Sequence, residues 1–263
     1  MGYIFSDKRA IITGASGGIG GGIAKKFVDL GVKVSLTDRR ERQLNSVVEE
    51  INKNGGTAIA IRGDATKRED IAAVVEKTVK QFGGIDIMVN CAGVGGPVYF
   101  EDISEQRLRE HMEVNYFAAI EYCRRIIPLM KKQGGGYIVN IASVSALIGF
   151  PTYVSYSASK AALLRFSDSL RHEVKKYGIK ISVLCPSLVN TAMVTDHWED
   201  HADWISKFKI LEVDPVVGSL IKGMHKERFI ILDAPDVRLM YALYRYFPRV
   251  FTRIFMWLYK IKV

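Results

Sequence analysis

Residues 10–20 read Ala10-Ile11-Ile12-Thr13-Gly14-Ala15-Ser16-Gly17-Gly18-Ile19-Gly20, and the architecture of this 263-residue chain can be worked out from them. The first four residues predict a short apolar strand, and the glycine-rich run predicts a tight turn into a helix that ends near Leu30. At the start of such a helix, free N–H groups and the helix dipole favour an anion, and glycine lets a pyrophosphate approach the backbone. A glycine-rich turn alone is weak support, but its place between a first strand and a helix indicates a dinucleotide site.

The rest of the chain alternates strands with helices of ten or more residues. Further helices are predicted at Arg40–Asn54, Lys67–Phe82, Ser104–Lys132 and Tyr153–Tyr177, and further strands at Lys33–Thr37, Thr57–Arg62, Ile85–Asn90, Tyr137–Ile141, Lys180–Leu184 and Phe229–Leu232. This order predicts an α/β fold, a doubly wound seven-stranded parallel sheet of the Rossmann type with helices on both faces. Because the composition changes after Pro235, we expect residues 1–235 to form a single dinucleotide-binding catalytic domain and residues 236–263 an extension.

The composition is that of an ordinary globular protein, with 48% hydrophobic and 25% charged residues. Three widely spaced cysteines do not suggest a disulfide framework and fit a reducing compartment. Met1–Arg9 lacks the apolar segment of a secretory signal, and no window reaches the roughly 18 uninterrupted apolar residues of a transmembrane helix. We therefore expect an intracellular protein on the cytoplasmic side.

A second pattern lies later in the chain, where Tyr156-Ser157-Ala158-Ser159-Lys160 follows Ser143. Tyr and Lys four positions apart on a helix lie on one face, one turn from each other. A phenol loses its proton at about pH 10, and a nearby ammonium lowers that pKa, so Tyr156 and Lys160 can exchange a proton with an alcohol or a carbonyl. Ser143 can hold the substrate oxygen. The alternative is a serine-rich amphipathic helix in which the Tyr and Lys have no joint role.

Asp38 ends the second predicted strand, 24 residues after Gly14. A carboxylate there can accept both hydroxyls of an adenosine ribose and would repel a 2′-phosphate, which favours NAD over NADP. Arg39 and Arg40 follow directly, and arginines at this turn can grip a 2′-phosphate. We expect NAD, with NADP as the less favoured cofactor; a solvated charged turn is the alternative to both.

Taken in order, these motifs resemble the short-chain dehydrogenase/reductase family from about Lys8 to Leu232. The resemblance rests on the T-G-x-x-x-G-x-G run at 13–20, Asp64 after the third strand, Asn90-Cys91-Ala92-Gly93 after the fourth, Asn115 in the long helix, Ser143, and Tyr156-x-x-x-Lys160. Each motif alone is weak, and together they are specific. The resemblance implies a homodimer or homotetramer built on the helices that carry Asn115 and Tyr156.

The resemblance also implies roles for individual residues. Tyr156 would be the catalytic acid and base, Lys160 would bind the nicotinamide ribose and lower the Tyr156 pKa, and Ser143 would hold the substrate oxygen. Asn115 would anchor a water in a proton relay, although a polar residue in a helix can also bond its own backbone. The expected catalytic residues are therefore Asn115, Ser143, Tyr156 and Lys160.

For the cofactor, Asp64 would bond the adenine beside Ala65, Asn90 would steady the sheet, and Gly93 would border the ribose. The complete set expected to bind the dinucleotide is Gly14, Ser16, Gly18, Ile19, Gly20, Asp38, Arg39, Asp64, Ala65, Asn90, Gly93, Tyr156, Lys160, Pro186, Val189 and Thr191. The family usually has glycine after Pro186, so Ser187 puts the local backbone in doubt because serine tolerates a positive φ poorly. Thr191 still matches the position that contacts the carboxamide.

The chemistry implied is reversible hydride transfer with Tyr156 as acid or base. The main alternative is a catalytically silent dinucleotide-sensing binding or scaffold protein, which the intact set of four catalytic residues disfavours. A third possibility is a reductase that uses NADPH.

Three segments should cover the catalytic face: Val94–Phe100, Val144–Thr152 and Ala192–Val213. Their apolar and aromatic content, including Met193, Trp198, Trp204 and Phe208, predicts a lipophilic alcohol or ketone such as a steroid, retinoid or fatty-acyl derivative. The alternative is a lid that merely packs on the core. His197 and His201 have a spacing that zinc ligands use, but the H-E-x-x-H glutamate is absent and the chemistry needs no metal. We expect no metal site and a solvated acidic lid helix.

Residues 236–263 carry six of the basic residues and one acidic residue, within a net charge of +9 for the chain. Arg238, Arg245, Arg249, Arg253 and Lys260 would form one stripe on a continuous helix, interleaved with aromatic residues. Pro248 must kink or divide that helix. A basic, aromatic, amphipathic segment predicts a peripheral membrane anchor. The alternative is packing on a second subunit or over the substrate cleft; nucleic acid is not expected, because no motif accompanies the charge.

Overall fold

A computed structural model describes residues 2–196 and 208–258, and seven strands in these ranges form one parallel sheet in the order β3-β2-β1-β4-β5-β6-β7. The strands are β1 (Arg9–Thr13), β2 (Lys33–Asp38), β3 (Ala58–Arg62), β4 (Ile87–Asn90), β5 (Gly136–Ile141), β6 (Ile179–Cys185) and β7 (Ile230–Leu232). The predicted doubly wound fold is confirmed. Because the order reverses between β1 and β4, the loops that leave these two strands diverge and open a crevice at the carboxyl edge.

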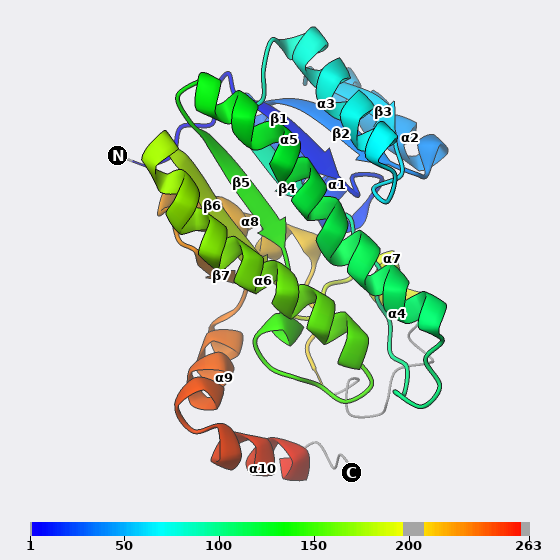
Figure 1. The fold of residues 1–263 in the computed structure, drawn as a ribbon, viewed down its shortest axis with the longest axis vertical. Helices are drawn as coiled ribbons and strands as arrows, with labels where there is room; N and C mark the ends of the chain where they lie inside the picture. The colour runs from blue at the N-terminus through cyan, green and yellow to red at the C-terminus, as the bar shows by residue number, and fades with distance from the viewer. Residues whose placement is uncertain (1, 197–207, 259–263) are drawn as a thin grey trace.

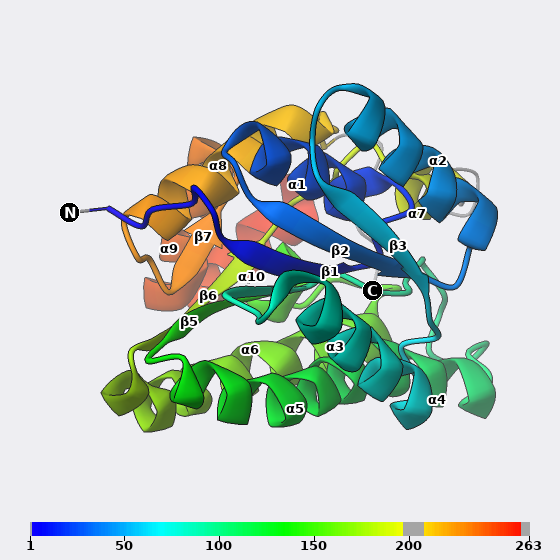
Figure 2. The ribbon, with the colours of Figure 1, turned by 90° about the horizontal axis from the view of Figure 1, so that it is seen from above.

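Helices cover both faces of the sheet, as Figure 2 shows from above. One layer holds α1 (Gly18–Asp29), α2 (Glu41–Lys53) and α8 (Val213–His225), and the other holds α3 (Arg68–Phe82), α4 (Glu105–Met112), α5 (Ala118–Lys132) and α6 (Val154–Val174). Short turns of helix lie at η2 (Val144–Ala146), η3 (Lys175–Tyr177) and α7 (Ala192–Thr195). Helix α8 was not among the predicted helices, although Val216, Leu220 and Met224 recur at helical spacing and are buried.

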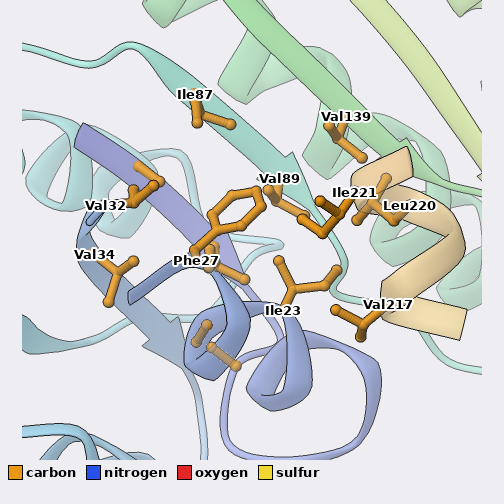
Figure 3. Close-up of a cluster of buried hydrophobic side chains, with 14 of the residues drawn as sticks. Ile23, Phe27, Val32, Val34, Ile87, Val89, Val139, Val217, Leu220 and Ile221 are labelled. Carbon is orange, nitrogen blue, oxygen red and sulfur yellow. The ribbon is translucent and has the colours of Figure 1, made fainter. Parts of the chain in front are cut away.

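Two apolar cores lie on opposite faces of the sheet. Figure 3 shows the first, where Ile23 and Phe27 of α1 meet Leu220 of α8 over the strands. Neighbouring residues of β1 divide between the cores, with Ile12 in this core and Ile11 in the one under α3 and α5. Each of these large side chains is fully buried, which stabilises the fold by about 1.5–3 kcal/mol per residue. The two cores hold the carboxyl edge of the sheet in place.

Glycines in α1 allow close packing on that first core. A Cβ on Gly22 would overlap the side chain of Val213 at the start of α8, and one on Gly20 would overlap the carbonyl oxygen of Gly14. The extra glycines in the first helix therefore have a packing reason, which the sequence alone did not reveal.

The long helix predicted over Ser104–Lys132 is interrupted. Ser104 caps its start as expected, since its Oγ accepts a hydrogen bond from the Arg107 amide at 3.2 Å. Between α4 and α5, however, Glu113–Phe117 forms a π-helical turn that contains the buried Asn115. Such turns shift the helical register by one residue and often occur at functional sites.

The C-terminal residues form two helices, α9 (Pro235–Tyr246) and α10 (Pro248–Leu258), at the end of the molecule beyond β7 (Figure 1). Pro248 is the first residue of α10, so the prediction that it divides the helix is confirmed. In the described part of the chain, every helix is too short or too polar to cross a bilayer.

Candidate active site

A cavity of about 930 Å³ opens at the carboxyl edge of the sheet, where β1 and β4 diverge. It runs from the glycine loop after β1, past Tyr156, to Phe208 and α9. All of the predicted site residues line it except Asn90 and Asn115, which lie behind its wall. The fold therefore gathers into one cavity residues that are spread from Gly14 to Thr191 in the sequence.

The glycine loop fits a pyrophosphate. Gly18 has φ +55°, and a Cβ there would lie 3.1 Å from Thr191 Cγ2, so this loop and the loop after β6 approach closely. Helix α1 begins after Gly17 without a side-chain cap, which leaves its first N–H groups directed at the cavity. Thr13 Oγ1 accepts hydrogen bonds from the Cys91 and Ala92 amides, each at 2.9 Å, and so ties β1 to the chain after β4.

Asp38 presents a buried carboxylate to the same cavity. Its Oδ2 accepts from Ser16 Oγ at 2.7 Å, and its Oδ1 accepts from the Arg40 amide at 3.0 Å and from Arg40 Nε at 3.3 Å. Burial by itself would raise the pKa of Asp38, but these hydrogen bonds and the Arg40 charge outweigh it, so the pKa is lowered. Both Arg39 and Arg40 line the cavity, and Arg40 is paired with the carboxylate.

Asp64 lies at the adjacent edge of the cavity with Ala65. Its Oδ1 accepts from the Thr66 amide at 2.9 Å and from Thr66 Oγ1 at 2.8 Å. The Thr66 amide bond is the main reason that the pKa of Asp64 is lowered. An ionised carboxylate at this position can accept a hydrogen bond from the amino group of an adenine.

Asn90 and Asn140 form a buried polar link under the cavity floor. Asn90 Nδ2 donates to Asn140 Oδ1 at 2.7 Å, and Asn140 Nδ2 donates to Ser167 Oγ at 2.8 Å. These hydrogen bonds join β4, β5 and α6, in keeping with the expected role of Asn90 in steadying the sheet. Asn90 Oδ1 has no hydrogen-bond partner in the described part of the chain.

Asn115 ties the loop after β4 to α6. Its Oδ1 accepts from the Val94 amide at 2.9 Å, and its Nδ2 donates to the Val94 carbonyl at 3.0 Å and to Ser159 Oγ at 2.9 Å. The side chain therefore does not bond its own helix backbone, the alternative that the sequence left open. Nothing in the sequence pattern indicates Ser159 or Val94 as partners of Asn115.

Tyr156, Ser143 and Lys160 meet in the middle of the cavity. Tyr156 and Ser143 line the same cavity, and the serine hydroxyl is near enough to lower the Tyr156 pKa. Lys160 Nζ donates to the Ile141 carbonyl at 2.9 Å and lies 5.9 Å from the centre of the Tyr156 ring. A Cβ on Gly93 would lie 3.3 Å from Lys160 Nζ, so glycine there leaves room for the lysine amine.

Burial dominates the electrostatics of this pair. It raises the pKa of Tyr156 to about 12 despite the opposing hydrogen bond with Ser143, and it lowers the pKa of Lys160 to about 8. At neutral pH the phenol is therefore protonated and suited to donate. The prediction that Lys160 lowers the Tyr156 pKa is therefore wrong for this structure, because burial outweighs the effect of nearby groups.

His111 is a buried neighbour of this group that the sequence did not indicate. Its Nδ1 lies 2.7 Å from Ser155 Oγ, and its ring centre lies 6.2 Å from that of Tyr156 in an edge-to-face arrangement. Burial, helped by the Arg107 charge, lowers the pKa of His111. A neutral imidazole therefore packs against the phenol ring and helps to hold it in place.

Ser187 corrects one expectation. The residue does not have a positive φ, so the strain inferred from the missing glycine is absent. Instead, its amide and Oγ both donate to Asp233 Oδ2, at 2.7 and 2.9 Å. Burial nevertheless raises the pKa of Asp233. The bonds tie the loop that carries Thr191 to the end of β7.

The far end of the cavity is apolar. Met193, Phe150 and Phe208 line it, as expected from the predicted covering segments. Val237 and Met240 also line it, although they belong to the segment predicted as an extension. Several residues named in the sequence lie outside the described residues: His197, Trp198, His201 and Trp204 in the predicted lid, and Lys260 in the basic stripe.

Comparisons with known proteins agree with this geometry. The sequence model for the family described as short chain dehydrogenase matches residues 8–202. An uncharacterized oxidoreductase of Thermotoga maritima is 41% identical over 182 residues, which cover 69% of this chain and 72% of that protein.

Two solved structures share the fold. A short chain dehydrogenase/reductase from Burkholderia phymatum in complex with NAD aligns with a TM-score of 0.85 at 26% identity, covering 94% of this chain and 96% of that chain. A 7α-hydroxysteroid dehydrogenase complexed with NADH and 7-oxo glycochenodeoxycholic acid aligns with a TM-score of 0.76 at 27% identity, covering 87% and 93%. Sequence and fold therefore point to the same family.

Proposed function

The chain belongs to the short-chain dehydrogenase family of oxidoreductases, and from this premise we propose that it transfers hydride between NAD and a lipophilic secondary alcohol or ketone. The observation that carries the proposal is the meeting of Tyr156, Ser143 and Lys160 between a dinucleotide cradle and an apolar cavity end. Bound NAD supplies the hydride acceptor, or the donor in its reduced form.

The chain's own residues supply the proton chemistry. Tyr156 gives its proton to a carbonyl oxygen in reduction and takes the hydroxyl proton in oxidation. Ser143 holds the same oxygen by a hydrogen bond, and Lys160 carries the positive charge that favours the phenolate and holds the nicotinamide ribose. Asn115 keeps the wall beside Lys160 in place through its bonds to Val94 and Ser159.

The cofactor preference rests on Asp38. A buried carboxylate with a lowered pKa stays ionised and can accept both ribose hydroxyls, whereas it repels a 2′-phosphate. Arg40, which could otherwise bind that phosphate, is paired with the same carboxylate. NAD is therefore the proposed cofactor, and NADP is the weaker candidate. The Burkholderia relative in complex with NAD and the steroid dehydrogenase with NADH support this choice.

The substrate class rests on the cavity end formed by Phe150, Phe208, Met193, Val237 and Met240. An apolar end of this kind favours a steroid, retinoid or fatty-acyl alcohol or ketone. The hydroxysteroid dehydrogenase neighbour, solved with a bile-acid derivative, supports the same class.

We further propose that the enzyme is a homodimer or homotetramer that associates with a membrane from its cytoplasmic side. Leu108, Phe117 and Val154 are exposed apolar residues along α4, the π turn and α6, the helices expected to carry the subunit contact. Residues 236–258 are proposed as the membrane contact. Light scattering of the purified protein would reject the oligomer if its mass equals that of one chain.

The function is tested by absorbance of reduced nicotinamide. NAD and NADP are supplied separately with a panel of steroid, retinoid and acyl alcohols and ketones, and Tyr156→Phe is the control. We expect turnover with NAD that the substitution abolishes. Cofactor binding without turnover across the panel would instead favour the alternative, a catalytically silent dinucleotide-sensing protein.

A further inference from the structure

The C-terminal helix pair, α9 and α10, forms part of the cavity wall with its inner face. Val237 is 6% exposed and, together with Met240, lines the cavity from α9. The ring centre of Phe255 on α10 lies 5.7 Å from that of Phe150 and 6.0 Å from that of Phe208, and both of these rings line the cavity. The pair is therefore a wall of the substrate end and not a tail beside it.

The outer face of the same pair exposes large apolar side chains. Trp257 is 77% exposed and Phe247 is 61% exposed. Eight of the fifteen large apolar residues exposed in the described chain lie on this pair: Leu239, Leu243, Tyr246, Phe247, Val250, Ile254, Trp257 and Leu258. A concentration of this kind marks a surface that binds something apolar.

The charges beside these residues indicate what binds. Arg238, Arg245, Arg249 and Arg253 are all exposed, and the sequence from 237 to 263 contains no Asp or Glu. Arginine beside exposed aromatic and aliphatic residues matches the boundary between acyl chains and anionic headgroups. A second copy packed by two-fold symmetry would bring the same arginines against each other, which disfavours a subunit contact here.

The base of the pair is joined to the cofactor loop. Asp233, two residues before α9, accepts two hydrogen bonds from Ser187, and its carbonyl accepts from Ser219 Oγ at 3.2 Å. Arg238 Nη2 donates to the Leu232 carbonyl at 3.2 Å. Toward the other end, α10 packs on the protein through ring contacts of Phe255. The pair is thus held at both ends, with its inner face on the cavity and its outer face exposed.

We propose that the outer face of α9 and α10 docks on an anionic phospholipid surface, and that lipophilic substrate passes from that surface into the cavity along the inner face. The substrate part of the inference rests on the proposed function. Docking on lipid and uptake of a lipophilic ligand do not require turnover, so they can be measured separately.

Docking is tested by co-sedimentation with phosphatidylcholine vesicles that contain or lack phosphatidylserine. The unaltered protein should bind the anionic vesicles more tightly. The double substitution Phe247→Ser, Trp257→Ser should weaken binding about 100-fold, because each buried aromatic is worth about a factor of ten. Arg249→Gln with Arg253→Gln should remove the preference for phosphatidylserine. Ile4→Ser, at a residue 67% exposed near the N-terminus, is the matched control and should bind normally.

Entry is tested by transfer of the fluorescent sterol dehydroergosterol from anionic vesicles to the protein. Met240→Trp, on the inner face, should keep vesicle and NADH binding but slow sterol transfer severalfold. Transfer as fast as in the unaltered protein would reject entry along α9. Normal vesicle binding by the double substitution Phe247→Ser, Trp257→Ser would reject docking. A change in the oligomeric mass of that variant would also reject docking, because it would show that the outer face is a subunit contact. Docking that depends on Trp257, with no turnover of any alcohol, would reject only the proposed function.

Discussion

Replacing Asp38 by Ala should reverse the cofactor preference. In the structure this carboxylate is buried, is held ionised, and is bonded to Ser16 and Arg40 at the cavity wall. With Ala, NAD loses two charge-assisted hydrogen bonds to its ribose, each worth about 1.5–3 kcal/mol. Taking the lower figure for both, the loss is about 3 kcal/mol, or about 100-fold in Kd.

The same substitution should improve binding of NADP. It removes a like charge whose repulsion at a partly buried site is on the order of a few kcal/mol, and it frees Arg40 from its ion pair. Discounting this for solvent, we expect a gain of about tenfold. The ratio of the two dissociation constants should therefore change by about 1,000-fold.

Fluorescence titration with NADH and NADPH measures both constants without a substrate. Asp64→Ala is the matched control, because a carboxylate at the adenine should weaken both cofactors by the same factor and leave their ratio unchanged. Circular dichroism confirms that each variant is folded. An unchanged ratio in the folded Asp38→Ala protein would refute the role assigned to this residue.

Three further predictions follow from the packing and the buried charges. Burial lowers the pKa of Lys160 from 10.5 to about 8, so between these pH values the unfolded chain holds a proton that the folded chain has lost. The contribution of Lys160 to the free energy of unfolding should therefore rise with pH from about 8 to 10.5. Urea titrations at each pH should show it as the difference between the unaltered protein and Lys160→Met, because this difference cancels the opposing effect of Cys91, Cys123 and Cys185, whose pKa burial raises from 9 to about 12 in both proteins. Asn115→Ala should lower the free energy of unfolding by about 2–3 kcal/mol and reduce turnover, because three hydrogen bonds are lost; equal stability in urea titration would contradict the network. Gly22→Ala should destabilise by about 1–3 kcal/mol through overlap with Val213, whereas Gly218→Ala, with open space around its Cβ, should stabilise by about 0.5–1 kcal/mol; thermal melts that show the same sign for both would contradict this packing.

The fold and most of the cavity lining could be predicted because their signals are local. Gly18 lies just after β1, and Asp38 is the last residue of β2; parallel strands bring their carboxyl ends to one edge. Helix α8 was missed, although its apolar spacing is readable, because the segment before it was interpreted only as a lid. Hydrogen-bond partners were harder to predict, since Ser159 and Val94 meet Asn115 only after the π turn changes the helical register.

The direction of a pKa shift depends on the balance between burial and nearby charges, and the spacing of residues in the sequence does not reveal burial. Tyr156 and Lys160 were correctly placed on one helix face, and an ammonium one turn away does favour a phenolate. In the folded protein, however, both groups are withdrawn from water, and burial raises the phenol pKa to about 12 while it lowers that of the lysine to about 8. Burial results from packing by distant segments, including Gly95, whose added Cβ would lie 3.0 Å from the Tyr156 ring.

In the C-terminal segment, too, the local sequence predicts some features, while others depend on residues that are distant in the sequence. Its sequence indicates two unlike faces, and Pro248 indicates that the faces belong to two helices. It does not indicate which face meets the protein, because that depends on Phe150 and Phe208, which come from loops far away in the sequence. Once Phe255 packs against these rings, the arginines and Trp257 are left outside, and the apolar residues that remain exposed are those a lipid surface could cover. The two alternatives that the sequence left open for this segment, a cleft cover and a membrane contact, are therefore compatible: each uses a different face of the same helix pair.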